Sequence, residues 1–359
     1  ADANKDKIHA RIKSFLGINP MEVGMKLDIK QYETVYRVKV IDTTASTADG
    51  ADEHSNIALD LYTFDKMDAG HEYEIEYTIY PHPNKNQKVV AIATRVETLN
   101  AEASFVVDTG LLSQLQTKGT VEERVEKLYQ SAKHHIAKHL NKGLWLMMDL
   151  VFNSFLEINY GVDTWGALDI FVLGDTSTGK SETAKGLNNL YNFGHFVPLK
   201  NATTTGLIGG SRKDGENMLN TIGATPRQHR KLVVLEEFSG ADPSFIKTMT
   251  DIRTSRRVHI VRVAGELDVP CNLRMITISN PIGDERGLPK YLGTFPNGVM
   301  PLMELINNPE DVGRYDGFYL MPTVEGRKNP FGITLKGTPI PKEVYEHKAQ
   351  WNYTRKKEN

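Results

Sequence analysis

The eight residues Gly174-Asp-Thr-Ser-Thr-Gly-Lys-Ser181 carry more information than any other stretch of this chain. They satisfy the pattern G-x-x-x-x-G-K-[ST], whose glycines let backbone N–H groups turn inward around phosphate oxygens. The apolar run 167–173 before them predicts a buried strand. Residues 182–191 after them predict a helix, because apolar side chains recur there at helical spacing. A strand, a glycine loop and a helix in this order indicate a phosphate-binding P-loop; the alternative is a chance glycine-rich turn.

The P-loop predicts a role for each of its side chains. We expect Lys180 to reach the β- and γ-phosphates of a nucleotide and Ser181 to ligate Mg²⁺. ATP and Mg²⁺ are therefore the expected cofactors. The residues expected to contact the nucleotide are Gly174, Asp175, Thr176, Ser177, Thr178, Gly179, Lys180, Ser181 and Glu182.

Composition sets wide limits on the class of protein. The 359 residues suffice for two or three domains, and a net charge of −2 neither requires nor excludes a nucleic-acid partner. Cys271 is the single cysteine, which excludes disulfides within the chain and zinc sites built from several cysteines. The sequence holds no apolar run of about 18 residues. We therefore expect no membrane partner and a cytoplasmic location, at a nucleoid or a viral replication site, or a nuclear one in a eukaryotic host.

Residues 1–100 have the pattern of a small β domain preceded by a short helix. Four segments alternate apolar with polar residues or are β-branched, and a fifth strand could begin at 24–28. We expect an OB-fold-like β-barrel, with another small barrel or a sandwich as the alternative. The four segments are 35–41, 57–64, 73–80 and 89–96. Residues 101–160 predict a linker followed by two helices that are broken near Asn141-Lys-Gly143.

From residue 161 onward strands and helices alternate, as in an α/β nucleotide-binding domain. The apolar strand predicted at 231–235 ends in two acids, of which Glu236 is expected to help hold Mg²⁺ and Glu237 to polarise an attacking water. The strand predicted at 273–279 ends in Asn280, which could orient that water. The alternatives are a solvated acidic turn for the two glutamates and a turn-capping role for Asn280 before Pro281.

The order of these motifs resembles that of AAA+ ATPases, and finer details are similar to the minichromosome maintenance (MCM) replicative helicases. The resemblance covers roughly 145 to 355 and rests on motifs that are weak singly, apart from the P-loop. They are Val172-Leu-Gly-Asp175, Ala202-Thr-Thr-Thr-Gly-Leu207, Glu237-Phe238, Asn280-Pro-Ile-Gly283, Gly313-Arg-Tyr-Asp316, which looks like the S-R-F-D arginine finger, and Lys348-Ala-Gln-Trp-Asn-Tyr-Thr-Arg355.

The resemblance implies a ring-shaped, hexameric DNA helicase of replication that hydrolyses ATP at subunit interfaces. It implies an AAA+ core over 161–335, a truncated C-terminal lid at 336–359, and Arg314 as the arginine supplied to the neighbouring subunit. Glu236 departs from the aspartate that the family uses, and Gly179 from its alanine. The family's N-terminal zinc cysteines and a sensor-2 arginine have no counterpart. A plasmid or a virus is the expected source of so short a chain.

The resemblance also indicates where DNA would bind. Residues 252–267 correspond to the pre-sensor-1 hairpin and place Arg262 at its basic position, while 209–215 correspond to the tip of the helix-2 insert. Single-stranded or forked DNA is the expected partner. The candidate phosphate contacts are Arg262, Arg212, Lys213, Arg256 and Arg257, with Arg253 as further local charge; an exposed, solvated surface is the alternative for each. In the β domain, Tyr36 and Tyr80 could stack on bases beside Arg37, Lys39 and Lys88, but nothing in the sequence selects a face, and an ordinary solvated surface is the favoured alternative.

Two other functions stay open at this point. One is another AAA+ remodeller, of the chelatase or transcription-activator kind. The other is a replication initiator or loader that uses ATP only to assemble, without processive unwinding.

Overall fold

The computed structural model describes residues 35–41, 58–67, 73–81, 89–98, 105–116, 118–155, 157–159, 161–200, 202–214, 217–262, 265–284, 286–306, 308–323, 333–354 and 356–358. The chain divides into two compact units, 1–99 and 100–359. The expected helix within residues 1–20 and the expected strand at 24–28 lie outside the described residues.

The described part of the first unit is a four-stranded sheet with the order β1-β2-β4-β3. The outer pairs are antiparallel, the central β2–β4 pair is parallel, and β3 has an irregularity between Glu76 and Tyr77. The strands are β1 (Tyr36–Ile41), β2 (Ala58–Thr63), β3 (Tyr73–Pro81) and β4 (Val89–Thr98). The four strands expected from the alternation are thus confirmed, while closure into a barrel stays a prediction.

The register of this sheet separates its two faces. Val38, Leu61, Ala91 and Ile79 form one row across the four strands, in which Leu61 and Ala91 are completely buried. Paired residues share a face and successive residues alternate. Tyr36, which pairs with Thr63, therefore lies on the face of Leu61, and Tyr80, which pairs with Val90, lies on the other face. Tyr36 and Tyr80, the two candidates for base stacking, therefore lie on opposite faces of the sheet.

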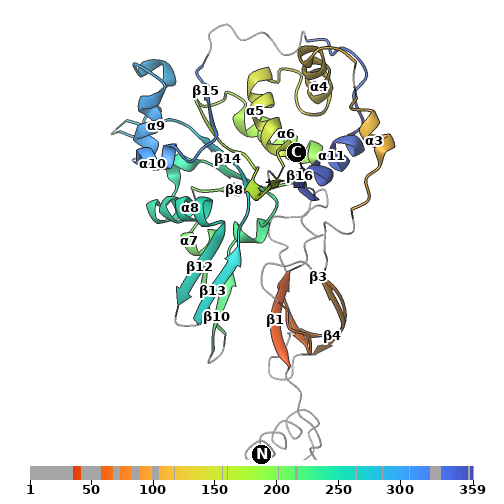
Figure 1. The fold of residues 1–359 in the computed structure, drawn as a ribbon. Coiled ribbons are helices and arrows are strands. Elements are labelled where there is room, and N and C mark those ends of the chain that lie inside the picture. The colour runs from red at the N-terminus through yellow and green to blue at the C-terminus, as the bar shows by residue number, and fades with distance from the viewer. Residues whose placement is uncertain are drawn as a thin grey trace, which may run out of the picture. The chain divides into compact units, whose positions relative to one another are not determined.

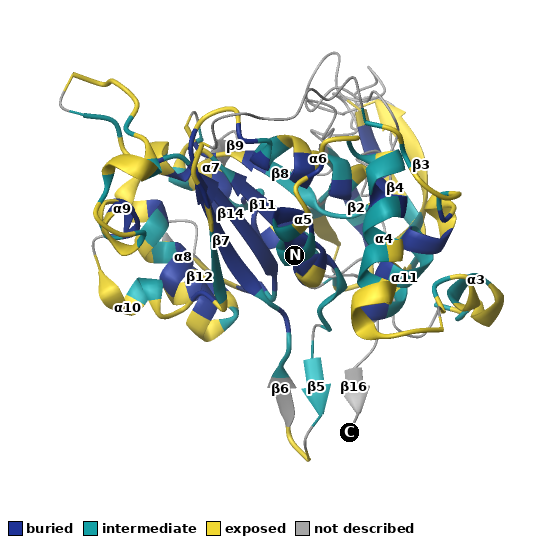
Figure 2. Ribbon diagram, turned by 90° about the horizontal axis from the view of Figure 1, so that it is seen from above, coloured by how far each residue is buried: buried dark blue, intermediate teal, exposed yellow. Residues whose placement is uncertain are grey.

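The second unit is built on a five-stranded, all-parallel sheet with the order β15-β7-β14-β11-β8 (Figure 1). Its strands are β7 (Asp169–Gly174), β8 (His195–Pro198), β11 (Leu232–Glu236), β14 (Arg274–Ser279) and β15 (Gly317–Met321). The three central strands are buried almost throughout, as Figure 2 shows, and β7 and β11 are mostly apolar, whereas β14 mixes polar with apolar residues. Such burial is typical of parallel strands that helices cover on both faces. The expected α/β fold is confirmed at this level.

Alternate residues of the central strands enter two separate cores. Ile170 and Val172 of β7 pack toward α5, α6 and α11, while Phe171 and Leu173 pack toward α8 and α9. The helices of the first face are α5 (Lys142–Asn153), α6 (Lys180–Tyr191) and α11 (Lys342–Thr354), with α3 (Thr109–Ser113) and α4 (Val121–His135) at its margin. Those of the second face are α7 (Thr204–Leu207), α8 (Pro243–Ser255), α9 (Val299–Leu305) and α10 (Pro309–Val312).

The predicted break between two helices is confirmed, because α4 ends at His135 and the side chain of Asn141 caps α5. The expected lid segment contributes α11, whose Val344, Tyr345 and Ala349 are buried in the same core as α5 and α6. Among the described helices, none is both long and apolar enough to cross a membrane.

Two β-hairpins project from the second unit beside α7 and α8 (Figure 1). One pairs β9 (Gly209–Asp214) with β10 (Asn217–Ile222), and the other pairs β12 (Arg257–Arg262) with β13 (Gly265–Pro270). They contact each other through β9 and β12, where a Cβ on Gly209 would meet Ile260 Cδ1 at 3.0 Å. A third small sheet joins β5 (Glu157–Asn159), β6 (Asp163–Trp165) and β16 (Lys356–Glu358).

Candidate functional site

The P-loop runs from the end of β7 into the first turn of α6. Ser177 and Gly179 have φ values of 59° and 88°, so the loop turns through the left-handed region before Lys180 begins the helix. A Cβ on Gly179 would meet no atom within 4 Å, so glycine serves the backbone conformation here rather than a lack of space. The loop therefore leads its backbone to the N-terminus of α6, which favours anions.

Lys180 is buried, and neutral oxygens surround its ammonium group. Its Nζ donates to the carbonyl oxygens of Gly174 at 2.8 Å and Asp175 at 2.6 Å, and to Thr178 Oγ1 at 3.1 Å. Burial lowers the pKa of Lys180 from 10.5 to about 8, although Asp175 and Glu236 act in the opposite direction. A buried cation held by neutral groups fits an anionic ligand such as a phosphate chain.

The carboxylate of Asp175 accepts hydrogen bonds from protein backbone. Its Oδ1 accepts from Leu292 N at 2.7 Å and its Oδ2 from Thr323 N at 2.6 Å, and the side chain is almost completely buried. The N–H of Asp175 donates to Met321 O at 3.0 Å. Asp175 thus ties two distant loops to the P-loop, a role that nothing in the local sequence indicates.

Asn280 follows β14, the strand between the P-loop strand β7 and the acidic strand β11. Its Oδ1 accepts from Lys180 Nζ at 3.0 Å, across 100 residues of sequence. Parallel strands end at one edge of a sheet, so the ends of β7, β14 and β11 are neighbours there. The structure therefore brings the expected P-loop lysine and the expected sensor asparagine into contact.

The two acids stand at the same edge in different environments. Glu236 is half-buried at the end of β11, and its carbonyl accepts from Leu199 N at 2.9 Å. Glu237 is exposed and has φ 57° and ψ 45°, a left-handed conformation that residues with a Cβ seldom adopt. This turn separates the two carboxylates, so the first stays near Lys180 and the second faces solvent.

A magnesium ion would find hard oxygen donors at this edge. The candidates are the hydroxyl of Ser181, in the first turn of α6, and the carboxylate of Glu236, which is close enough to act on the pKa of Lys180. Mg²⁺ prefers oxygen ligands and keeps several waters, so two protein ligands beside a phosphate chain suit it. The residues present therefore fit the expected ion.

Arg314 lies at the opposite edge of the sheet from the P-loop. Asp316 N donates to Asp169 O at 2.8 Å, and Asp169 begins β7, while the P-loop follows the last residue of that strand. Six strand residues span roughly 20 Å. Arg314 itself donates to Thr254 Oγ1 and lies 3.9 Å from the carboxylate of Asp311. It is exposed, and it is not part of the site that its own chain builds.

The candidate DNA contacts divide into residues near the ends of the two hairpins and arginines that pair with groups inside the chain. Arg262 ends β12 opposite Gly265, beside a two-residue connection, and Arg212 and Lys213 lie near the end of β9. The predicted hairpin around 252–267 is confirmed, and 209–214 form a strand of the second hairpin rather than its tip.

The other two arginines have partners within the chain. Arg257 Nε donates to both carboxylate oxygens of Asp268, at 2.8 and 3.0 Å. Arg256 lies 3.9 Å from buried Asp169, and its guanidinium stacks 4.0 Å from the ring centre of Trp165. Both side chains are therefore engaged in internal pairs, which the sequence pattern does not reveal.

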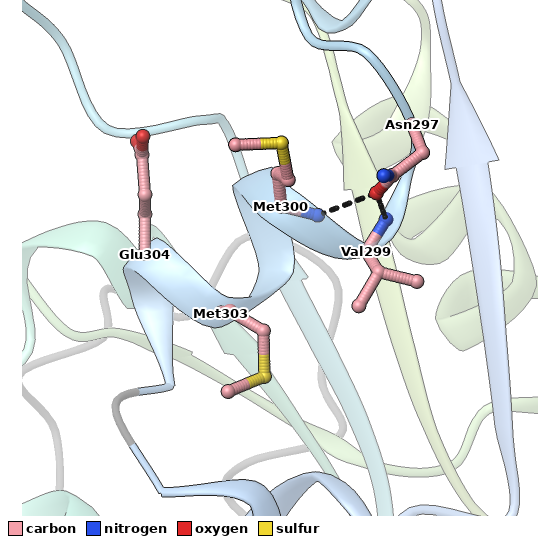
Figure 3. A pocket seen from close by; sticks show the side chains of 5 residues that line it. All are labelled: Asn297, Val299, Met300, Met303 and Glu304. Atoms are coloured by element: carbon pink, nitrogen blue, oxygen red, sulfur yellow. Dashed lines mark hydrogen bonds between the residues drawn. The ribbon is translucent and has the colours of Figure 1, made fainter.

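A shallow groove lies on α9, separate from the P-loop (Figure 3). Its lining consists of Asn297, Val299, Met300, Met303 and Glu304. The side chain of Asn297 caps the helix by accepting from Val299 N at 3.0 Å and Met300 N at 3.1 Å. None of these residues belongs to the expected site, and their apolar side chains offer no phosphate ligand.

Comparisons with protein families and with curated proteins do not assign the chain to a family. No protein-family model matches the chain, and no curated protein is significantly similar to it in sequence.

Proposed function

We propose that the chain is an ATP hydrolase of the AAA+ class, similar to the MCM replicative helicases, that works as a ring on DNA. The observation that carries this proposal is the hydrogen bond between Lys180 and Asn280, at the edge where the acidic strand also ends. Lys180, Asn280 and Glu236 are far apart in sequence but lie at one edge of the sheet. A shared binding site would explain why the fold brings them together.

The chemistry follows from the placement of each group. Lys180 would leave its neutral oxygens for the β- and γ-phosphates, and Asn280, released from Lys180, would orient a water molecule. Glu237 would polarise that water for attack on the γ-phosphorus. When held by Ser181 and Glu236, Mg²⁺ would neutralise negative charge on the phosphate oxygens.

A ring is supported by the position of Arg314. An arginine that stabilises the charge on the phosphoryl group in the transition state raises the rate of hydrolysis by about 10³ to 10⁵. Arg314 lies a strand length away from its own P-loop, so it can serve only a P-loop of another copy. A head-to-tail arrangement that repeats this contact gives a ring when the rotation between neighbouring copies closes, and we propose that it does. By the resemblance, the ring is a hexamer.

DNA as the substrate is supported by the two adjacent hairpins. Arg262, Arg212 and Lys213 lie near their ends, where six copies would surround a central strand. In the first unit, an OB-fold-like barrel would add a single-strand surface. Such a motor works where DNA is replicated, in the cytoplasm or, in a eukaryotic host, in the nucleus.

Nucleotide hydrolysis is the direct test. Lys180→Ala should abolish ATP hydrolysis, while Lys185→Ala, an exposed lysine of the same helix, should leave it unchanged. If Lys180→Ala still hydrolysed ATP, the P-loop would not be the site of hydrolysis.

Unwinding of a forked duplex tests the second half of the proposal. ATP-dependent strand separation by the wild-type protein is expected. Slow, DNA-insensitive hydrolysis with stable rings and no strand separation would instead identify an initiator or loader.

A further inference from the structure

Beneath Arg314 lies a buried cluster of charged and aromatic groups that the chemistry above does not use. Tyr315, the next residue, is buried, and its hydroxyl accepts from Arg253 Nη2 at 2.7 Å. The guanidinium of Arg253 also stacks on the Tyr315 ring, with 4.0 Å between its central carbon and the ring centre. Arg253 belongs to α8, so this contact joins the arginine loop to that helix.

The cluster is short of hydrogen bonds for its charge. Arg253 and Asp169 are both more than nine-tenths buried, yet Arg253 Nε lies 3.8 Å from Asp169 Oδ2, beyond hydrogen-bond distance. Among the described residues, Arg253 Nε and Asp169 Oδ1 have no hydrogen-bond partner. When the nearest carboxylate is too far for a hydrogen bond, a buried cation is stabilised mainly by its other hydrogen-bond partners. For Arg253, the Tyr315 hydroxyl is the closest of these.

The residues around this cluster also hold the backbone that follows Arg314 and the Arg314 side chain. Asp316 N donates to Asp169 O at 2.8 Å, and Asp169 N donates in return to Asp316 Oδ2 at 2.7 Å. Arg314 donates to Thr254, the neighbour of Arg253 on α8. The backbone after Arg314 is therefore hydrogen-bonded to Asp169, and the Arg314 side chain is hydrogen-bonded to Thr254, the residue next to Arg253.

We propose that Tyr315 and Arg253 are positioning residues that hold Arg314 in the orientation needed for the neighbouring subunit's nucleotide. This inference rests on the proposed function. The hydroxyl of Tyr315 is the specific element, because the S-R-F-D motif that this segment resembles has phenylalanine at that position. A displacement of about 1 Å in a catalytic group can cost about a hundredfold in rate, so the support matters.

Tyr315→Phe removes the hydroxyl alone. The ring stays packed, since Phe171 and Phe318 lie 5.3 and 5.6 Å from it between ring centres. We expect kcat for ATP hydrolysis to fall about tenfold with KM unchanged, because a hydroxyl bonded to a buried guanidinium is worth about that factor. The matched control is Tyr319→Phe, which removes the hydroxyl of a tyrosine four residues further on, in β15, that donates to Asn141, and it should retain the wild-type rate.

Subunit mixing separates support of Arg314 from general damage. Tyr315→Phe subunits keep an intact P-loop, and Lys180→Ala subunits keep an intact Arg314 with its support. Hydrolysis should therefore recover when the two variants are mixed, whereas a defect in the site of its own chain would persist. Amide hydrogen exchange gives a second readout. The N–H groups of 311–316 should exchange faster in Tyr315→Phe than in the wild-type protein or in Tyr319→Phe.

Each remaining outcome decides between the two proposals. If Arg314→Ala is inactive but Tyr315→Phe matches the wild type in rate and exchange, only the positioning role is wrong. If Tyr315→Phe is slow and mixing restores nothing, Tyr315 acts within its own subunit and the inference also fails. If the wild-type protein hydrolyses no ATP, or Arg314→Ala hydrolyses it normally, the proposed function fails and this inference falls with it.

Discussion

The two edges of the parallel sheet in the second unit are built in opposite ways. At the carboxyl edge, the carboxylates of Asp175 and Glu236 act on Lys180, and its own hydrogen bonds go to neutral oxygens. Backbone at this edge turns through left-handed conformations and leaves Glu237 open to solvent. Under the proposed function, this edge binds the nucleotide and receives the arginine for phosphoryl transfer from another copy of the chain.

At the amino edge, arginines are plentiful and mostly buried. Arg253 and Arg256 converge on Asp169, whereas Arg314 is exposed. The comparison shows that the buried lysine and the exposed arginine, which the proposed function brings together, lie at opposite edges of the same sheet. In the proposed function, one copy of the chain presents two separate halves of a reaction site, and a second copy joins them.

The largest expected effect comes from removing the exposed arginine. Arg314→Ala should lower kcat for ATP hydrolysis about 10³- to 10⁵-fold, because the transition-state charge loses its counter-ion. Steady-state hydrolysis with and without single-stranded DNA measures this. Arg124→Ala, an exposed arginine of α4, is the control. A loss of less than about threefold would mean that the amino edge has no catalytic part.

The next effect is on stability and concerns the buried charges of the amino edge. Burial raises the pKa of Asp169 to about 6, so its carboxylate is ionised at pH 7.5 and balances Arg253 and Arg256. Asp169→Asn leaves both cations unpaired and should lower the free energy of unfolding by about 3 kcal/mol. Urea denaturation at pH 7.5 measures the change.

A second buried aspartate supplies the control for that measurement. Asp149 accepts from the Tyr191 hydroxyl at 2.7 Å and from Asn153 Nδ2 at 3.0 Å, and burial raises its pKa. Its hydrogen-bond donors are neutral groups, so Asp149→Asn should cost less than Asp169→Asn. An equal or larger loss for Asp149→Asn would contradict the importance given to the arginine cluster.

A smaller effect is the pH dependence of ATP affinity, which we expect from Lys180 at the carboxyl edge. Burial lowers the pKa of Lys180 to about 8, so the amine is charged below pH 8 and loses its proton above it. A bound phosphate favours the charged form and raises this pKa. ATP affinity should therefore be constant up to about pH 8 and then fall by up to about tenfold per pH unit, with proton uptake on binding.

Titration with a fluorescent ATP analogue from pH 7 to about 9.5 measures that dependence. Lys180→Arg, which stays protonated throughout, should bind with flat pH dependence. Equal affinity of the wild-type protein at both ends of the range, without proton uptake, would show that Lys180 does not meet the phosphates.

The smallest effect concerns the hairpin end. Arg262→Ala should weaken single-strand binding and reduce the slope of log K against log salt by about 0.7, as expected for one phosphate contact with a single strand. Basal ATP hydrolysis should stay within about twofold of the wild-type rate, because the hairpin lies outside the site. Arg257→Ala is the matched control, since Asp268 already neutralises Arg257. An unchanged salt slope would exclude Arg262 as a DNA contact.

Local signals were sufficient for much of this architecture. The P-loop with its flanking strand and helix, the strands at 231–235 and 273–279, and the hairpin near Arg262 were predictable because periodicity and turn residues act over short distances. The meeting of Lys180 with Asn280 was also predictable, since strand ends converge at one edge of a parallel sheet.

Long-range contacts were not predictable from these patterns. The carboxylate of Asp175 binds backbone 117 and 148 residues away, and no local pattern distinguishes this from a nucleotide contact. Arg256 turns inward because Asp169 and Trp165, far from it in sequence, form the other side of its pocket. Which cations face solvent depends on such partners.

The central claim is that neighbouring copies share each reaction site, and one mixing experiment tests it most directly. Lys180→Ala and Arg314→Ala are each expected to be inactive alone, because each lacks one half of every site. In an equal mixture that assembles at random, roughly a quarter of the interfaces would join an intact P-loop to an intact arginine, and ATP hydrolysis should return to about that fraction of the wild-type rate. A mixture that forms joint assemblies yet stays as inactive as its components would contradict the claim.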